Sequence, residues 1–367
     1  MKIGILGTRG IPNYHGGFEQ FAEYFSIYLA SQGQEVFVYN SSCHPYKEST
    51  FKGVHIIHCY DPENKIGTIG QFIYDFNCIL DSRKRSFDII LQLGYTSSSI
   101  WRKLLPSKPK IVTNMDGLEW KRSKYSVLVQ KFLLYAENLA IKSSDFLISD
   151  SVGIKEYLKS KYKKDSKYIA YGAKVFYNPK VEIIRKYDLE PFKYNMLVAR
   201  LEPENNIETI LDGIKISNNK SPFLVVGKHD TNKFGKYLKK KFSKCNNIKF
   251  VGAIYDLDIL NNLRYFSNLY FHGHSVGGTN PSLLEAMSSN ALIVANDNIF
   301  NRSILEENAL YFNTSNDITT YINSCNKSDY TFILKNNIKN IEKKFNWNFI
   351  NNEYLNFITE IVTNDEN

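Results

Sequence analysis

The stretch HGHSVGGTNPSLLEAM, at residues 272–287, combines residue types that suit the binding of a phosphorylated ligand. It begins where an apolar strand pattern ends, and Pro281 opens the helical pattern that follows. Four residues stand immediately before that helix: Gly277, Gly278, Thr279 and Asn280. Free backbone N–H groups and the helix dipole favour an anion at such a place. The other interpretation is that the glycine pair only makes a turn.

Glu285 lies one turn into the same helical pattern. A carboxylate beside a phosphate is electrostatically unfavourable, unless it accepts hydrogen bonds from hydroxyl groups instead. A ribose diol attached to the phosphate is a partner of that kind. We therefore expect the glycine loop to bind phosphate and Glu285 to bind the attached sugar.

A second glycine-rich loop, GILGTRGIPNYHGGFE at residues 4–19, joins a strand pattern to a helix pattern. Gly16 and Gly17 open that helix directly, so we favour them as the phosphate-facing pair. The earlier glycines do not have the GxGxxG spacing, and the second strand ends in Asn40 rather than in an acid. A dinucleotide-dependent oxidoreductase is therefore the weaker alternative.

Two further strand patterns end in a charged residue. Asp116, in TNMDGLEW, is placed to accept a proton or to hold a sugar hydroxyl, or it only forms a turn. Arg200, in VARLEPEN, offers a guanidinium group that suits a diphosphate. The alternative for Arg200 is a surface ion pair with Glu202 or Glu204.

The sequence predicts no metal site and no cofactor. Asp256 and Asp258 stand at the start of a helix pattern, which favours helix capping over binding of a divalent ion. His272 and His274 share a strand face but have no third ligand nearby in the sequence. The five cysteines are widely spaced and form no CxxC, which fits reduced thiols in the cytoplasm.

Short apolar runs alternate with helix patterns along nearly the whole chain, which predicts parallel, doubly wound α/β sheets. We expect strands at residues 2–6, 35–39, 54–58, 87–93, 110–114, 145–149, 167–171, 195–199, 222–227, 247–252, 268–273, 291–296 and 309–312. The charged stretch 175–194, with its two prolines, is expected to be a linker. The strand ends of two such domains would face one cleft, where ligands of open parallel sheets bind.

Composition narrows the class of protein. Of the 367 residues, 43% are apolar, enough for the cores of about two domains. No window reaches about 18 uninterrupted apolar residues, and the start is too short for a signal peptide, so we expect a cytoplasmic protein. The net charge of +9 gathers in clusters, which are either solvated helix faces or binding surfaces for phosphates or an anionic membrane. No nucleic-acid-binding motif accompanies the charge, so nucleic acid is not favoured.

Four motifs, taken together and in order, give the chain a family resemblance that spans nearly all of its length. GTRGIPNYHGGFE, MDGLEWKRSKY, VARLEPENN and HGHSVGGTNPSLLEAM resemble the GT-B glycosyltransferases of family 4, in particular the bacterial rhamnosyltransferases of capsule, O-antigen and cell-wall synthesis. The resemblance implies an N-terminal domain at residues 1–174, a nucleotide-sugar domain at 175–345 and a helix at 346–367 that crosses back.

The resemblance also implies an activity. It is the metal-independent, retaining transfer of a sugar, rhamnose above all, from a nucleotide diphosphate sugar to a lipid-diphosphate-linked saccharide at the inner membrane face. Arg200 would hold the diphosphate, Glu285 the ribose, and Gly16 and Gly17 the donor phosphate or the acceptor. The turn from Gly252 to Ile254 would contact the base. A nucleotide-sugar epimerase and a non-catalytic sugar-nucleotide-binding protein are the alternatives.

Three positions depart from the family pattern. Gly277 stands where the family has a glutamate that contacts the donor sugar, and Asn205 stands where it has a phosphate-binding lysine. We still expect both Gly277 and Asn205 to contact the donor. Asp116 takes the place of the family's commoner histidine, which favours a positioning role over proton transfer. Arg9 and Lys228, both near strand ends, are candidates for the charge that Asn205 lacks.

Overall fold

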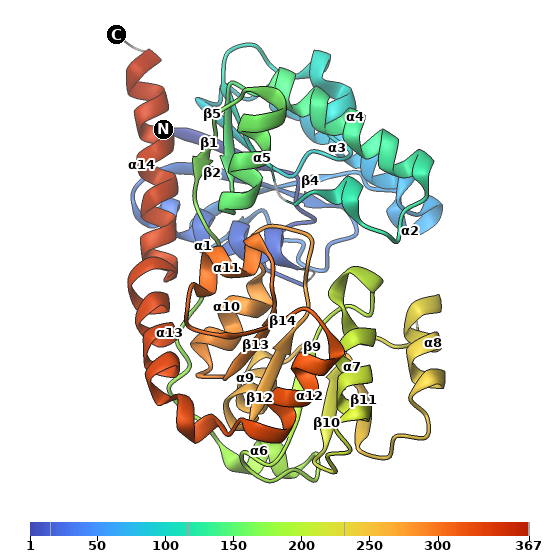
Figure 1. Cartoon of the computed structure of the whole chain (residues 1–367). Helices are drawn as coiled ribbons and strands as arrows, with labels where there is room; N and C mark the ends of the chain where they lie inside the picture. The colour runs from blue at the N-terminus through green and yellow to red at the C-terminus, as the bar shows by residue number, and fades with distance from the viewer. Residues whose placement is uncertain (15, 116, 231, 366–367) are drawn as a thin grey trace. The chain divides into compact units, whose positions relative to one another are not determined.

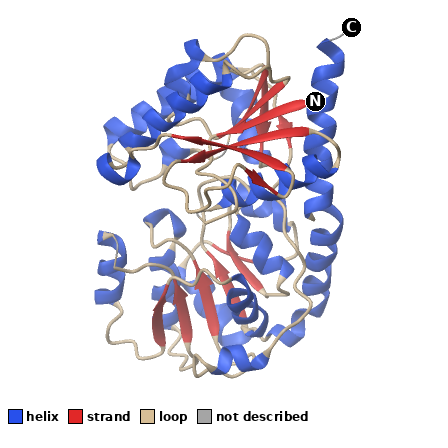
Figure 2. Cartoon of the chain, turned by 180° about the vertical axis from the view of Figure 1, so that it is seen from behind, coloured by secondary structure: helices blue, strands red, loops and turns tan. Residues whose placement is uncertain are grey.

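The computed structural model describes residues 1–14, 16–115, 117–230 and 232–365, and it divides into two compact units. Unit 1 comprises Met1–Trp120, Tyr125–Tyr171 and Trp347–Asn367. Unit 2 comprises Lys121–Lys124 and Gly172–Asn346. Each unit is built around its own sheet, with helices packed around it (Figure 1, Figure 2).

Unit 1 has an eight-stranded sheet in the order β3-β4-β2-β1-β5-β6-β7-β8, in which only the β3–β4 pair is antiparallel. Its strands are β1 (Lys2–Leu6), β2 (Glu35–Ser41), β3 (Thr50–Phe51), β4 (Val54–Cys59), β5 (Ile89–Leu93), β6 (Lys110–Asn114), β7 (Phe146–Ser149) and β8 (Lys167–Tyr168). Its helices are α1 (Gly17–Ser31), α2 (Glu63–Ile66), α3 (Ile69–Ser82), α4 (Val127–Ser143), α5 (Val152–Tyr162) and α14 (Trp347–Asp365). Two 3₁₀ turns cover Ser99–Leu104 and Glu119–Lys121.

The last helix, α14, belongs to unit 1 because one apolar stripe along it packs there. The stripe recurs at helical spacing and consists of Trp347, Ile350, Tyr354, Ile358 and Ile361, each at most 8% exposed. On α1, Phe21 and Phe25 contact the ring of Tyr354, and Tyr24 stacks on Trp347 with ring centroids 4.4 Å apart.

Unit 2 has a six-stranded sheet in the order β11-β10-β9-β12-β13-β14, and all of its pairs are parallel. Its strands are β9 (Asn195–Val198), β10 (Phe223–Val226), β11 (Ile248–Gly252), β12 (Leu269–His272), β13 (Ile293–Asn296) and β14 (Leu310–Phe312). Its helices are α6 (Val181–Arg185), α7 (Ile207–Ile216), α8 (Lys233–Lys241), α9 (Leu257–Phe266), α10 (Pro281–Ser288), α11 (Ile299–Leu305), α12 (Ser315–Ser324) and α13 (Thr331–Lys344). Two 3₁₀ turns cover Pro203–Asn205 and Lys327–Tyr330.

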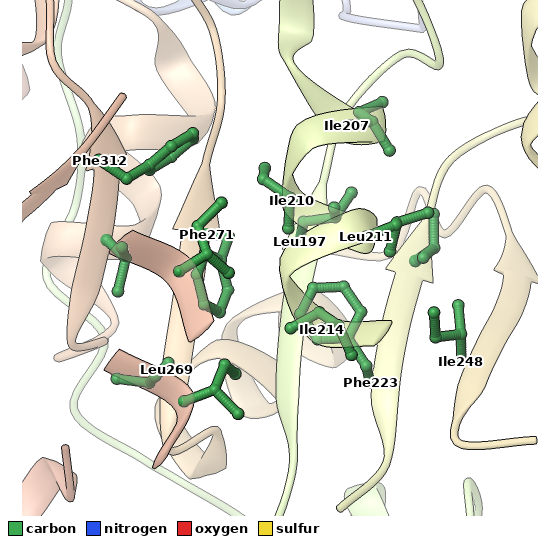
Figure 3. Close-up of a cluster of buried hydrophobic side chains, with 14 of the residues drawn as sticks. Leu197, Ile207, Ile210, Leu211, Ile214, Phe223, Ile248, Leu269, Phe271 and Phe312 are labelled. Carbon is green, nitrogen blue, oxygen red and sulfur yellow. The ribbon is translucent and has the colours of Figure 1, made fainter. Parts of the chain in front are cut away.

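The core of unit 2 explains why its strands read as continuous apolar runs. Alternate residues of a strand point to opposite faces, and helices cover both faces of a doubly wound sheet. On one face, Leu197, Phe223 and Phe271 pack against Ile210 and Ile214 of α7 (Figure 3). Residues between them, such as Met196 and Tyr270, are equally buried on the other face.

The expected fold class is confirmed, since both units are α/β sheets of the doubly wound type, wholly parallel in unit 2 and parallel except for the β3–β4 pair in unit 1. The stretch 175–194 is not the linker that we expected. It lies within unit 2 and contains α6, whose Ile184 is fully buried. The hydroxyl of Tyr194 donates a 2.6 Å hydrogen bond to the carbonyl of Leu263, so this stretch is part of the unit 2 core. None of the helices in the described ranges is both long and apolar enough to span a bilayer.

Candidate functional site

The glycine loop after β1 is held by a side chain from the end of β2. The Asn40 side chain is fully buried, accepts a 3.0 Å hydrogen bond from the N–H of Ile11 and donates a 2.8 Å bond to the Ile11 carbonyl. Gly10 has φ of +125°, and a Cβ there would lie 2.3 Å from the Asn40 side chain, so only glycine fits. The Asn40 side chain therefore holds this loop, at the place where a dinucleotide-binding sheet offers an acid to ribose.

Gly16 and Gly17 begin α1 as predicted. Gly16 is the N-cap residue, its backbone is extended, and no side chain caps the helix there. Among the described residues, a Cβ on Gly16 would meet only the Glu19 carboxylate, at 3.5 Å, so the packing described around Gly16 does not demand glycine. The binding role of the two glycines stays a prediction.

Arg9 is engaged within unit 1. Its Nε and Nη2 atoms donate hydrogen bonds of 3.0 and 2.8 Å to the carboxylate of Glu63, in a two-pronged ion pair. The hydrogen bonds that Arg9 donates to the Glu63 carboxylate raise the pKa of Arg9. Because this carboxylate already balances the guanidinium, Arg9 is a weak candidate for the charge that Asn205 lacks.

Several predicted donor-site residues follow the strands of unit 2 at one edge of its sheet. The carboxyl ends of parallel strands meet at the same edge, and ligands bind where the strand order reverses. In unit 2 the reversal lies between β9, which leads to Arg200, and β12, which leads to Gly277. Lys228 follows β10, with its Nζ 5.8 Å from the ring centroid of Tyr255, and Gly252 ends β11 with φ of +79°. Ile254 lies two residues further along and is half-buried.

Arg200 is exposed and makes no ion pair with any residue in the described ranges, so the surface pair with Glu202 or Glu204 does not form. Asn205 is only 4% exposed, and its amide donates a 2.7 Å hydrogen bond to the Arg200 carbonyl. Asn205 thus closes the turn that presents Arg200. Its predicted contact with the donor stays a prediction.

The loop of residues 277–280 leads into α10 as expected. Asn280 is the N-cap residue, and its side chain accepts a 2.9 Å hydrogen bond from the N–H of Ser282. Pro281 occupies the first helical position, and Thr279 is buried. Gly277 has φ of +134°, a conformation that favours glycine over the glutamate of the resembled family. Gly278, between Gly277 and Thr279, is half-buried.

Glu285 does not stand alone, which the sequence did not predict. Its Oε2 atom lies 2.7 Å from Nη2 of Arg264, a residue of α9 that is completely buried. Arg264 also donates hydrogen bonds to Asn261, at 3.1 Å, and to Ser282, at 3.3 Å. The Glu285 side chain remains 22% exposed. The ion pair fixes one carboxylate oxygen of Glu285, and no hydrogen bond to the other oxygen is found among the described residues. A lone arginine in the apolar helix pattern LDILNNLRYF was the available sequence signal.

Two stacked histidines lie where β12 ends. The rings of His272 and His274 have centroids 4.4 Å apart and an interplanar angle of 19°. Burial lowers the pKa of His274 to about 3, with the charges of Arg200 and Arg122 adding to the effect. Burial also holds the pKa of His272 well below its ordinary value, with His274 and Arg264 adding. Both rings are therefore neutral at neutral pH.

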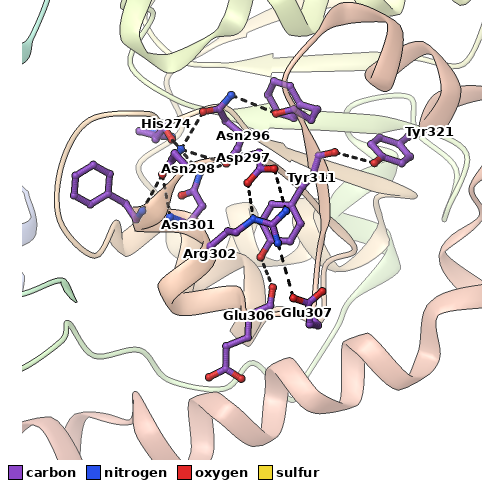
Figure 4. A network of polar contacts seen from close by, with 12 residues as sticks. His274, Asn296, Asp297, Asn298, Asn301, Arg302, Glu306, Glu307, Tyr311 and Tyr321 are labelled. Carbon is purple, nitrogen blue, oxygen red and sulfur yellow. Dashed lines mark hydrogen bonds and ion pairs between the residues drawn. The ribbon is translucent and has the colours of Figure 1, made fainter. Parts of the chain in front are cut away.

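The backbone at His274 is clamped by a polar network from the neighbouring strand end (Figure 4). Asn298 and Asn301 each donate a 3.0 Å hydrogen bond to the His274 carbonyl. Asn298 also caps α11, by accepting hydrogen bonds from the N–H groups of Phe300 and Asn301. This network fixes the point from which the glycine loop departs.

The described ranges contain no group of three or more histidine, cysteine, aspartate or glutamate side chains that could hold a metal ion. The two acids of the DLD motif begin a helix, as expected. Asp256 caps α9 by accepting hydrogen bonds of 2.9 and 3.1 Å from the N–H groups of Asp258 and Ile259. Asp116 lies outside the described residues. Its neighbour Met115 is buried and donates a 2.8 Å hydrogen bond to the Ile148 carbonyl.

Two protein-family models match the chain, one in each half of the sequence. Residues 180–344 match the family described as glycosyl transferases group 1, and residues 1–174 match a domain of unknown function, DUF1972. None of the curated proteins matches the sequence.

Solved structures share the fold at low sequence identity. Sucrose-phosphate synthase from Thermosynechococcus elongatus has a TM-score of 0.79 and 15% identity, with 99% of each chain covered. Anabaena HepE in complex with UDP has a TM-score of 0.74 and 15% identity, with 98% of this chain and 100% of that chain covered. A glycosyltransferase from Rickettsia africae has a TM-score of 0.72 and 16% identity, with 99% of each chain covered. At these identities the likeness concerns the fold.

Proposed function

We propose that this chain, which has the GT-B fold and carries a glycosyl transferases group 1 domain, transfers a sugar from a nucleotide diphosphate sugar to a hydroxyl group of an acceptor. One observation carries the proposal. Within that domain, the exposed guanidinium of Arg200 and the carboxylate of Glu285 both follow strands at the edge where parallel sheets bind ligands. The binding of UDP by HepE, which shares the fold, supports a nucleotide sugar as the partner.

Each of these residues has a role in the proposed transfer that follows from its side-chain chemistry. Arg200 holds the diphosphate and stabilises the charge that develops on it as the bond between the anomeric carbon and the phosphate oxygen breaks. Glu285 accepts hydrogen bonds from the ribose hydroxyls. The acceptor hydroxyl forms the new bond to the anomeric carbon, and its proton passes to the leaving diphosphate. Asp116 orients the sugar or the acceptor hydroxyl. The transfer retains the anomeric configuration and needs no divalent ion.

The donor sugar and the acceptor are the finer part of the proposal. Rhamnose as the sugar, and a lipid-diphosphate-linked saccharide as the acceptor, rest on the resemblance of the four motifs to rhamnosyltransferases of surface polysaccharide synthesis. A lipid-linked acceptor requires that the protein reach a membrane surface.

Exposed aliphatic side chains on two helices of unit 1 support such a membrane contact. Val127 and Leu128 at the start of α4 are 65% and 79% exposed, and Ile69 at the start of α3 is 66% exposed. The two helices meet at Phe72 and Phe132, whose ring centroids are 5.8 Å apart, so these aliphatic side chains belong to neighbouring helices. The exposed Lys131 follows on α4. Aliphatic side chains that insert beside lysines are the features of a protein that binds anionic lipid at the inner membrane face.

A transfer assay separates the proposal from its alternatives. Purified protein is incubated with a panel of nucleotide sugars, with and without a lipid-diphosphate-linked saccharide, and nucleoside diphosphate and sugar products are measured. Sugar transfer that requires the acceptor is the expected result. An isomerised nucleotide sugar formed without acceptor would identify an epimerase. Donor binding with no turnover in any mixture would identify a non-catalytic binding protein.

A further inference from the structure

A row of three ring-bearing polar side chains follows β12 toward the ligand-binding edge of unit 2. Tyr270, His272 and His274 are every second residue, and the stacked rings of the two histidines show that this alternation continues past the end of β12. The hydroxyl of Tyr270 lies 2.8 Å from that of Ser282 in the first turn of α10, so the row lies on the face that α10 covers. His272 is completely buried, whereas His274 is half-buried. The row thus reaches the surface with the imidazole of His274.

The His274 ring has no hydrogen-bond partner among the described residues. Its Nδ1 atom is enclosed by protein without a partner. Its Nε2 atom makes no hydrogen bond either, but that atom is not enclosed. A neutral imidazole carries one donor and one acceptor nitrogen, and polar atoms of folded proteins are nearly always paired. Nε2 is therefore the atom through which a molecule from outside the chain can pair with His274.

The register of the sheet places His274 near Arg200. The last residue pair between the parallel strands β9 and β12 joins Leu197 to Phe271. Three residues beyond that pair, the two strands lead to Arg200 and His274. The charge of Arg200 contributes to the low pKa of His274, which agrees with this placement. Three residues further along, a Cβ on Gly277 would meet no described atom within 4 Å, so the loop leaves room beside it.

The chemistry of the ring decides which part of a nucleotide sugar it suits. A diphosphate is bound best by a cation, and Arg200 supplies one. A sugar hydroxyl both donates and accepts hydrogen bonds, so a neutral imidazole pairs with it in either tautomer. Gly277 has no side chain that could offer such a contact.

We propose that His274 binds a hydroxyl group of the donor sugar through Nε2, beside the diphosphate that Arg200 holds. His274 is then a residue that recognises the sugar rather than the nucleotide. The inference rests on the proposed function, because it assumes that the ligand is a nucleotide diphosphate sugar.

The test compares His274→Phe and His274→Gln with the parent in calorimetric titrations with UDP-glucose, dTDP-rhamnose and GDP-mannose, and with UDP, dTDP and GDP. Phenylalanine keeps a ring for the stack but has no nitrogen, whereas the glutamine amide reaches about as far as Nε2. We expect His274→Phe to lose affinity about 2- to 10-fold for the nucleotide sugar that binds the parent best, with no change for its nucleoside diphosphate. His274→Gln should bind both like the parent.

His55→Phe is the matched control, because His55 also stacks on an aromatic ring, that of Phe37 in unit 1, with centroids 4.7 Å apart. It should leave both affinities unchanged. Parent-like binding of the nucleotide sugar by His274→Phe, or an equal loss for the nucleoside diphosphate, would overturn the inference while leaving the proposed function intact. A parent that binds none of these nucleotide sugars and nucleoside diphosphates would overturn both.

A measurement on the parent protein makes the test independent of how well His274→Phe folds. In nitrogen NMR spectra of protein with isotope-labelled histidine rings, the Nε2 signal that is missing from His274→Gln belongs to His274. That signal should shift when the nucleotide sugar is added and stay in place with the nucleoside diphosphate alone. An unchanged signal at saturation with the nucleotide sugar would contradict the assignment.

Discussion

The ion pair between Arg264 and Glu285 predicts that removing the glutamate harms the fold as well as ligand binding. In Glu285→Ala, the Arg264 guanidinium stays buried, with its side chain 1% exposed, and loses its only carboxylate partner in the described structure. Breaking a buried pair by removing one partner costs about 3–5 kcal/mol. Because the Glu285 side chain is 22% exposed, water can reach the vacated place, and we expect about 3 kcal/mol.

The magnitude is measured as the free energy of unfolding in urea, followed by circular dichroism. The exposed pair of Glu190 and Lys193, whose side chains are 73% and 74% exposed, supplies a matched control. Glu190→Ala should change the free energy of unfolding by less than about 1 kcal/mol. Parent-like stability of Glu285→Ala would refute the reasoning, because it would mean that the buried arginine does not need its partner.

A double variant separates the structural role of Glu285 from its role in ligand binding. Arg264→Met combined with Glu285→Leu replaces the pair by apolar residues, a change that is often close to neutral for stability. We expect this variant to unfold near the parent midpoint and yet to bind nucleoside diphosphate about 10- to 100-fold more weakly, because the ribose hydrogen bonds are lost. A double variant that binds as tightly as the parent would show that Glu285 does not contact the ribose.

The remaining predictions concern the ion requirement, the orienting residue, acid stability and the membrane. Turnover should survive EDTA, and full loss of turnover that magnesium restores would contradict a metal-independent transfer. Asp116→Asn should keep measurable turnover and Asp116→Ala should lose more, whereas equal losses in the range of about 10²- to 10⁴-fold would identify a proton acceptor. Between pH 6.5 and 3, His274 binds a proton in the unfolded chain but not in the folded protein, where its pKa is about 3. The free energy of unfolding should therefore fall as the pH drops through this window. His274→Asn should flatten the curve of unfolding midpoint against pH, and parallel curves for the variant and the parent would contradict this. Binding to anionic vesicles should fade with salt and weaken in Leu128→Asp, and equal binding to neutral vesicles would discard the membrane contact.

Most of the fold could be predicted from the sequence because buried parallel strands leave continuous apolar runs. Two of the expected strands, at residues 2–6 and 110–114, agree with β1 and β6 in both bounds. The two-residue strand β3 was missed, because it is too short to show any period. Helix α6 was missed because the prolines and charges around it resemble a linker, although Ile184 packs into the core.

The places of the candidate residues at strand ends could be predicted, but the residues that they contact could not. Arg200 and the glycine loop follow strand ends, where the topology of the sheet makes a ligand site expected. The partner of Glu285 comes from another helix, 21 residues earlier, and only the packing of α9 against α10 brings Arg264 beneath it. In the same way, nothing in the spacing of the sequence indicates that the segment at 121–124 belongs to unit 2.

A crystal structure of the protein with a bound nucleoside diphosphate, chosen as the tightest binder among UDP, dTDP and GDP, tests the central claim most directly. The account predicts the diphosphate within hydrogen-bonding distance of Arg200, beside the N-terminus of α10, with the ribose hydroxyls on the carboxylate of Glu285. A nucleotide bound elsewhere on the chain, or one at this edge of the sheet that contacts neither Arg200 nor Glu285, would contradict the account.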